Sequence, residues 1–237
     1  MIPALAVVPE EVEAVLLFGS QVRGDSDSSS DVDIAAFVNV NSADALIEVK
    51  KRLCVSAPEC NLSVYSLPTA NLMANDGSLF LWHLKFEGKY LFSRGRSFHV
   101  IMDSLKPYSC DKALRDVGTF EEVLKDVRAS LTSGPELTLY EAATLFSILR
   151  SLGMIASVVD GCPNFRRVEP IEYLSRLMGG ELAISDSDIE CLVRARHLYA
   201  RNVGDDVEID RTFALRIAAA VGQAAEFVRS HVSTKLQ

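Results

Sequence analysis

Two short stretches near the start of the chain carry side chains that could do chemistry together. Gly19 and Ser20 follow the apolar run Leu16–Phe18, and Asp31 and Asp33 stand at the head of a second apolar run. Side chains alternate along a strand, so Asp31 and Asp33 are expected on the same face. Two neighbouring carboxylates at the start of a buried strand repel each other unless a cation compensates them. Their oxygens suit Mg²⁺, which usually takes one or two carboxylates together with substrate phosphates.

The turn at Gly19 and Ser20 suits an anion. Glycine lets the backbone approach a ligand closely, the serine hydroxyl can donate a hydrogen bond, and free N–H groups at a helix start attract anions. Arg23, one turn further on, could add a charge-assisted contact to a phosphate or to a loop carboxylate. A phosphate cradle and a carboxylate pair on adjacent strands together predict a metal–nucleotide site. The alternative is an Asx-rich turn between two strands, in which Asp31 only caps the loop.

The spacing of these residues resembles a known family motif. Gly19-Ser20, ten residues, then Asp31-Val32-Asp33-Ile34 is similar to the glycine-serine and Asp-hydrophobic-Asp motif of the DNA polymerase β-like nucleotidyltransferase superfamily, especially its minimal and aminoglycoside members. The resemblance implies that the two aspartates bind Mg²⁺, with Mn²⁺ as an alternative. It also implies that Gly19 and Ser20 hold the triphosphate of an NTP, with ATP favoured. The implied reaction moves an NMP to an acceptor hydroxyl and releases pyrophosphate.

One position departs from the family pattern. A third strand is predicted over Cys60–Leu67, and in the family this strand carries a third catalytic carboxylate, which acts as a base or helps to hold a metal. Asn61 stands there instead, and an amide cannot take a proton at neutral pH. Three interpretations stay open: Asn61 holds the acceptor and a base comes from elsewhere, Glu59 substitutes, or the chain is a catalytically weakened nucleotide-binding or regulatory module. Base catalysis is worth about 10²–10⁴-fold, so its loss slows metal-assisted transfer without necessarily abolishing it.

The remaining elements of the first part are predicted from caps and breakers. Pro9–Glu11 predicts the start of a short helix, because proline suits the first turn and acidic residues favour a helix N-terminus. His83 is interpreted as a packed or surface histidine, not as a ligand. The other expected elements are a helix from an N-cap at Asn41 or Ser42 to Cys54, a helix over 68–87 with a break at 75–77, and a strand over 89–92.

From residue 97 onward the pattern is helical. Apolar residues recur at three- and four-residue spacings in the segments 111–131, 137–160, 169–178, 186–202 and 210–232. We therefore predict an α+β protein. Residues 1–96 form a polymerase β-like nucleotidyltransferase sheet with flanking helices, and residues 97–237 form a helical bundle for acceptor binding or dimerisation.

Five residues of the helical part are candidates for helix capping or for acceptor binding. Thr138 and Glu141 form a capping-box pattern before the most apolar helix. The resemblance implies that acceptor-binding groups lie on the bundle, where Glu136, Glu141, Arg166 and Arg167 are candidates. The favoured interpretation of these four is nonetheless that they are surface charges.

Composition limits the partners. The net charge of −8 disfavours a nucleic-acid partner, which usually needs a basic patch, and leans toward a small cationic acceptor or a protein. No apolar run is long enough to cross a bilayer, so no membrane partner is expected. The five cysteines, an odd number without paired spacing, favour a cytoplasmic location. A homodimer would be one way to supply the missing base. The sequence identifies neither the acceptor nor the nucleobase.

Overall fold

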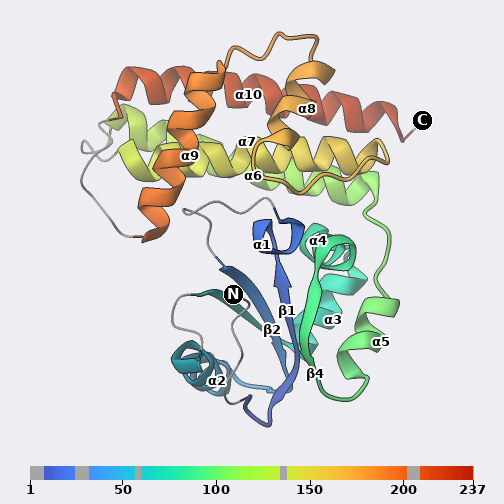
Figure 1. Ribbon diagram of the computed structural model, residues 1–237. Coiled ribbons are helices and arrows are strands. Elements are labelled where there is room, and N and C mark those ends of the chain that lie inside the picture. The colour runs from blue at the N-terminus through green and yellow to red at the C-terminus, as the bar shows by residue number, and fades with distance from the viewer. Residues whose placement is uncertain (1–7, 25–31, 57–59, 134–137, 202–208, 237) are drawn as a thin grey trace. The chain divides into compact units, whose positions relative to one another are not determined.

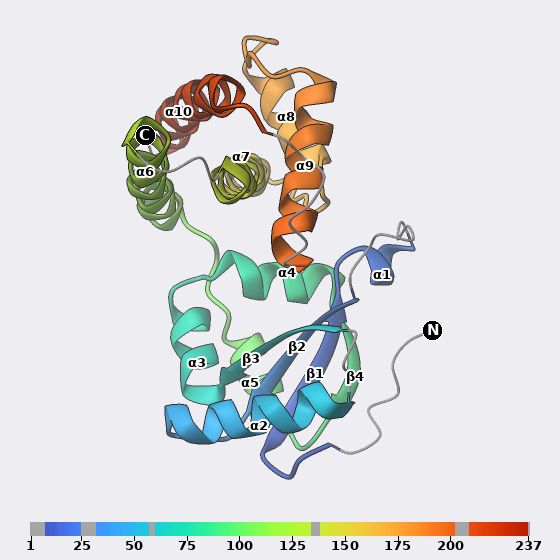
Figure 2. The same ribbon diagram turned by 90° about the vertical axis from the view of Figure 1, so that its left-hand side faces the viewer.

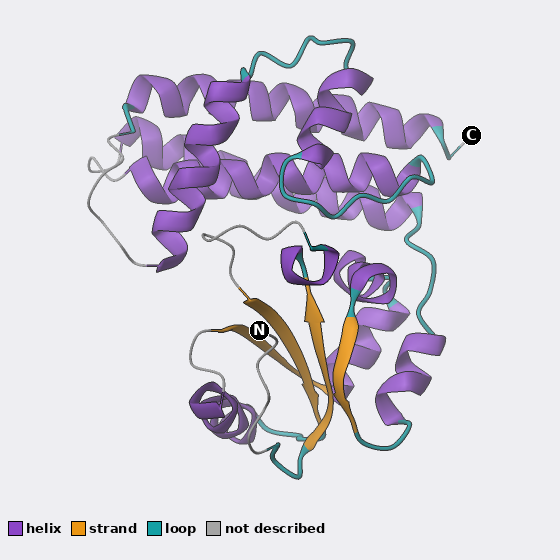
Figure 3. Cartoon of the chain, viewed as in Figure 1, coloured by secondary structure: helices purple, strands orange, loops and turns teal. Residues whose placement is uncertain are grey.

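The chain divides into two compact units, Met1–Tyr108 and Ser109–Gln237 (Figure 1). The computed structural model describes residues 8–24, 32–56, 60–133, 138–201 and 209–236. A sheet with flanking helices makes up the first unit, and the described part of the second unit is helical (Figure 3). This order of elements confirms the predicted α+β class.

The sheet of the first unit has four strands in the order β3-β2-β1-β4. β1 is antiparallel to β2 and to β4, whereas β2 is parallel to β3. The strands are β1 (Val12–Phe18), β2 (Val32–Val38), β3 (Cys60–Ser66) and β4 (Lys89–Ser93).

Helices cover both faces of this sheet. α2 (Ala43–Ser56) lies on one face, and α3 (Leu67–Asn75), α4 (Leu79–Glu87) and α5 (Ser97–Asp103) lie on the other (Figures 1 and 2). Alternate residues of β1 and β2 therefore enter two different cores: Leu17 and Ile34 belong to the core on the α2 side, whereas Leu16 and Phe37 belong to the core on the α3–α5 side. Burial on both faces explains why these strands are almost continuously apolar.

Two expected features of this unit are confirmed and one is wrong. Ser42 Oγ accepts a hydrogen bond from the Ala45 N–H, as an N-cap should, and the helix over 68–87 is broken into α3 and α4. Pro9–Glu11 does not open a helix. It forms a turn in which the Val12 N–H donates to the Pro9 carbonyl, because β1 already begins at Val12, whose side chain is fully buried.

The first unit extends past residue 96, where the sequence suggested a boundary. The Phe98 ring of α5 stacks on the Phe37 ring of β2 with centroids 3.9 Å apart. The Trp82 Nε1–H donates to the Lys106 carbonyl at 2.9 Å. These contacts attach α5 and the segment after it to the core on that face of the sheet.

The second unit is a bundle around α7. Its helices are α6 (Cys110–Ser133), α7 (Thr138–Val159), α8 (Glu169–Leu177), α9 (Asp186–Arg201) and α10 (Arg211–Thr234), which confirms the five predicted helical segments. α7 contacts α6, α8, α9 and α10 and lies among them in Figure 2. Among the described helices, α7 alone is long and apolar enough to cross a membrane, and 61% of its most apolar window is buried in the bundle. Its composition is that of a core helix.

The predicted capping box of α7 does not form. The Thr138 hydroxyl donates to the Ile209 carbonyl, and the Glu141 carboxylate is buried and accepts from the Ser130 hydroxyl. Both side chains are therefore bonded to neighbouring parts of the bundle and not to the first turn of α7. Tertiary partners have replaced the local ones.

A carboxylate at the end of α7 ties three elements of the bundle together. Asp160 accepts hydrogen bonds from Tyr173 Oη of α8 at 2.7 Å, from His231 Nε2 of α10 at 2.9 Å, and from Lys235 Nζ at 2.9 Å. Burial alone would raise the pKa of Asp160, but these three hydrogen bonds outweigh it and lower the pKa to about 2.

We expect Asp160→Asn to lower the free energy of unfolding by about 2 kcal/mol near neutral pH, because it weakens all three bonds. The folded-state pKa lies below the ordinary value, so the stabilisation is complete above about pH 4 and is lost as the pH falls toward about 2. Urea denaturation followed by circular dichroism should show a clear difference between wild type and variant near pH 7 that narrows near pH 2.5. An equal difference at both pH values would contradict this assignment.

Candidate active site

Strand pairing brings three of the predicted site residues to one end of the sheet. Phe18, the last residue of β1, is the register partner of Asp33 in β2, and Asp33 is the partner of Asn61 in β3. Gly19 follows Phe18 directly. The end of β1 and the starts of β2 and β3 therefore meet at this edge.

The backbone at Gly19 lies against the Asp33 carboxylate. Gly19 has a φ of 77°, and a Cβ placed on it would lie 2.8 Å from Asp33 Oδ2. Both the backbone conformation and the missing side chain are therefore required here. Ser20 then begins α1 (Ser20–Arg23), a single helical turn that ends at Gly24.

Asn61 holds the other oxygen of the same carboxylate. Its Nδ2–H donates to Asp33 Oδ1 at 2.9 Å. A neutral amide can orient a carboxylate in this way without repelling it, whereas a carboxylate at position 61 would place two negative charges side by side. The departure from the family pattern at Asn61 is thus in direct contact with Asp33.

The metal assignment depends partly on residues outside the described ranges. Asp31 and Glu59 both lie there, so their predicted roles remain predictions. Within the described ranges, no group of three His, Cys, Asp or Glu side chains could hold a metal ion. One or two carboxylates completed by substrate phosphates is the donor set that Mg²⁺ prefers, and Asp33, held between Gly19 and Asn61, fits that set.

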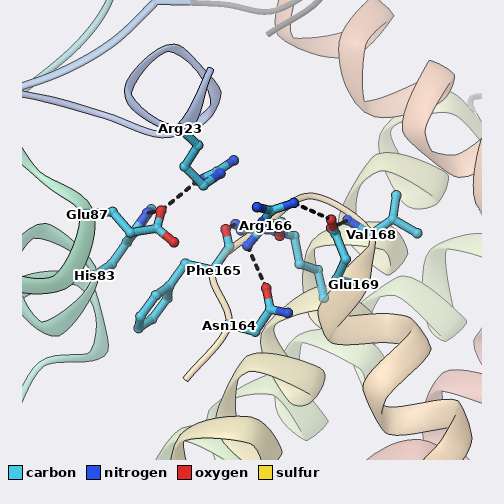
Figure 4. Close-up of polar contacts among 9 residues, drawn as sticks. Arg23, His83, Glu87, Asn164, Phe165, Arg166, Val168 and Glu169 are labelled. Carbon is cyan, nitrogen blue, oxygen red and sulfur yellow. Dashed lines mark hydrogen bonds and ion pairs between the residues drawn. The ribbon is translucent and has the colours of Figure 1, made fainter. Parts of the chain in front are cut away.

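Arg23 pairs with a carboxylate that sequence reasoning did not identify. Its Nη1 lies 2.6 Å from Glu87 Oε2 at the end of α4, and His83 Nε2 donates to the same oxygen at 3.1 Å (Figure 4). The side chains of Arg23, His83 and Glu87 are 13%, 12% and 19% exposed, so this cluster is largely shielded from water. The sequence offered one signal, the four-residue spacing of His83 and Glu87 on a predicted helix.

The cluster stabilises the ionised form of Glu87 and lies close to the sheet end. Burial alone would raise the pKa of Glu87, but hydrogen bonds from His83 and Arg23 outweigh it and hold the pKa of this carboxyl below its usual range. The His83 ring meets the Phe18 ring edge-on, with centroids 5.5 Å apart. His83 is therefore a packed histidine, as predicted, and it packs on the residue paired with Asp33.

Two of the four acceptor-site candidates in the helical unit, Arg166 and Glu141, are bonded to neighbouring groups of the bundle. Arg166 pairs with Glu169 at 3.2 Å, and its backbone N–H donates to Asn164 Oδ1 at 3.0 Å (Figure 4). Glu141 is buried and not a surface charge, and Glu136 lies outside the described residues. Arg167 lies in the same loop as Arg166.

We expect Gly19→Ala to destabilise the fold more than Gly24→Ala does. Both glycines have a φ of 77°, but Gly24 has a ψ of 14°, in the left-handed helical region, whereas Gly19 has a ψ of −154°, a conformation almost restricted to glycine. The backbone cost of an alanine is therefore larger at position 19. Only the Cβ at position 19 meets the Asp33 carboxylate, whereas nothing lies within 4 Å of a Cβ at position 24. Thermal unfolding of the two variants measures the difference, and equal losses would show that neither the backbone conformation at Gly19 nor its contact with Asp33 adds to the cost.

Asn61→Asp should make stability depend on Mg²⁺. Without metal, a second carboxylate beside Asp33 replaces a hydrogen bond with repulsion and should lower stability by roughly 1–2 kcal/mol at neutral pH. Adding Mg²⁺ should reverse this loss, because a divalent cation compensates paired carboxylates. Asn61→Ala is the control, since it loses the hydrogen bond without adding charge. Melting curves in which Mg²⁺ helps the two variants equally would refute the prediction.

Comparison with known proteins gives a family match and matches to solved structures. Residues 2–96 match the family model for polymerase beta nucleotidyltransferases, described as "Polymerase beta, Nucleotidyltransferase". The matched region contains the sheet and the residues Gly19, Ser20, Asp31, Asp33 and Asn61. No curated protein sequence matches the chain.

Among solved structures, the chain is similar to spectinomycin adenyltransferase AAD(9) from Enterococcus faecialis, crystallised with ATP and spectinomycin. The TM-score is 0.51 at 11% identity, over 92% of this chain and 93% of that chain. This likeness shows a shared fold. A toxin-antitoxin structure with AMP-PNP has a TM-score of 0.31 at 18% identity, covering 51% of this chain and 89% of that chain, and carries no argument. The family match covers residues 2–96, and this part of the chain therefore carries a polymerase beta nucleotidyltransferase domain.

Proposed function

We propose that the chain catalyses Mg²⁺-dependent transfer of an NMP from an NTP, with ATP favoured, to an acceptor hydroxyl. The observation that carries this proposal is the Asp33 carboxylate, held between the Gly19 backbone and the Asn61 amide inside the family domain. A carboxylate held in this way at the head of a buried strand is ready to accept a cation without first reorganising.

In the proposed reaction, Asp33 and Asp31 hold Mg²⁺, with Mn²⁺ as an alternative. When bound, the metal would neutralise charge on the triphosphate during in-line displacement. Gly19 and Ser20 bind phosphate oxygens through the backbone and the hydroxyl. The acceptor oxygen forms a bond to the α-phosphorus, the bond from that phosphorus to the bridging oxygen breaks, and pyrophosphate leaves.

The proton of the acceptor hydroxyl needs a destination other than Asn61. Because the Asn61 amide donates to Asp33, we assign it to holding that carboxylate. The base then comes from Glu59, from the acceptor side, or from a second copy of the chain. A second candidate function follows from the same observation: a nucleotide-binding or regulatory module in which the lost carboxylate has weakened catalysis.

The acceptor is proposed on charge. The net charge of −8 favours a small cationic molecule or a protein hydroxyl over a nucleic acid. The fold neighbour was crystallised with spectinomycin, which agrees with a small-molecule acceptor but does not extend to this chain at 11% identity. The five cysteines support a cytoplasmic location.

Label transfer tests the proposal. The chain is incubated with Mg²⁺, candidate acceptors, and ATP, GTP, CTP or UTP labelled at the α-phosphate. We expect transfer of label with release of pyrophosphate, reduced about 100-fold or more by Asp33→Asn, because that variant removes a metal ligand. Asp44→Asn, at the exposed start of α2, is the control and should retain activity.

Two other outcomes discriminate between the functions. Transfer that survives Asp33→Asn would overturn the proposed site. A chain that gains thermal stability with Mg²⁺ and ATP yet releases no pyrophosphate would be the non-catalytic module. In that case, activity in Asn61→Asp would show that the missing carboxylate is the cause.

A further inference from the structure

The turn that is proposed to hold phosphate has little packing of its own. α1 is four residues long and contains no fully buried residue, and its apolar contact is that of the partly buried Val22 with the core on the α2 side of the sheet. A single isolated turn is not stable by itself, because helix nucleation fixes several residues for one hydrogen bond. The position of α1 must therefore come from contacts with the rest of the first unit.

The last residue of α1 makes such a contact. Arg23 pairs with Glu87 of α4 at 2.6 Å, across 64 residues of sequence. Glu87 is itself held by His83, four residues earlier on the same helix, and His83 packs on Phe18 at the end of β1. Ion pairs that are largely shielded from water are stronger than exposed ones and better defined in geometry.

We propose that Glu87, supported by His83, is a positioning residue of the nucleotide site. It holds Arg23 and thereby fixes the turn from Gly19 to Gly24 against Asp33. Arg23 then acts as the tether of α1, and the turn presents its backbone and Ser20 to the nucleotide. This inference rests on the proposed function, since it assigns Glu87 a role in the same site.

A competing account predicts the opposite change in nucleotide affinity when the charge of Glu87 is removed. If Arg23 were a phosphate ligand that Glu87 withholds, the nucleotide would have to displace Glu87 to reach the guanidinium. Removing the charge of Glu87 would then free Arg23 and strengthen nucleotide binding. If Glu87 positions the turn, the same substitution loosens α1 and weakens binding.

Calorimetric titration with Mg²⁺ and α,β-methylene-ATP separates these accounts, because this analogue binds without being cleaved. We expect Glu87→Gln to weaken binding on the order of tenfold, comparable to losing a charge-assisted hydrogen bond. Arg23→Gln should weaken it similarly. The double variant should be no worse than either single variant, because both remove one tether.

The matched control is Glu11→Gln. It breaks the 2.7 Å pair of Glu11 with Arg52, another Glu–Arg ion pair of the first unit. This control should leave binding unchanged. His83→Asn, which removes the support of Glu87 but leaves Arg23 its partner, should weaken binding by a smaller factor. It also serves as the test if Glu87→Gln melts too low for titration.

The titrations can overturn the positioning role of Glu87 in two ways. Stronger or unchanged binding in Glu87→Gln, with wild-type folding by circular dichroism, overturns the positioning role. Additive losses in the double variant overturn it as well. Asp33→Asn keeps the two proposals apart: if it abolishes binding while Glu87→Gln does not affect it, the inference about Glu87 fails and the proposed function stands. Binding that ignores Asp33 removes the basis of both.

Discussion

The proposed chemistry of this chain depends on one carboxylate at the junction of three strands. Asp33 is the second residue of the buried strand β2, with one oxygen against a glycine backbone and the other bonded to the Asn61 amide. Such a group is unfavourable unless it is compensated, and the sheet places it where a cation and phosphates could do so. The hydrogen bond that orients it comes from Asn61 in the neighbouring strand β3, so its position depends on strand register.

The rest of the first unit makes that position rigid. Both faces of β1 and β2 are buried under helices, so the strands have no freedom to slip in register without exposing apolar side chains. The ion pair between Arg23 and Glu87 extends this rigidity to the short turn beyond the sheet. In the helical unit, the helices pack around α7. Asp160, at the carboxyl end of α7, is hydrogen-bonded to α8 and α10.

Much of this was predictable because the signals are local. Apolar runs identified the end of β1 and all of β2, alternation of apolar and polar residues identified β3, and periodic spacing identified the helices of the bundle. The residues of the Gly-Ser and Asp-x-Asp motif marked the sheet end. Errors arose where tertiary contacts override local preference: Pro9–Glu11 became a turn before a longer strand, and Thr138 and Glu141 bonded across the bundle. The ion pair of Glu87 with Arg23 could not be predicted, because the two residues are distant in the sequence and only the fold brings them together.

The central claim is that the Asp33 carboxylate binds a divalent cation beside a nucleotide. The most direct measurement is the anomalous diffraction of crystals grown with Mn²⁺ and α,β-methylene-ATP. We expect a strong anomalous peak at coordination distance, about 2.1–2.2 Å, from an Asp33 oxygen, with the same ion also bound by phosphate oxygens of the analogue. A nucleotide bound with no metal at Asp33, or a metal bound elsewhere, would contradict it.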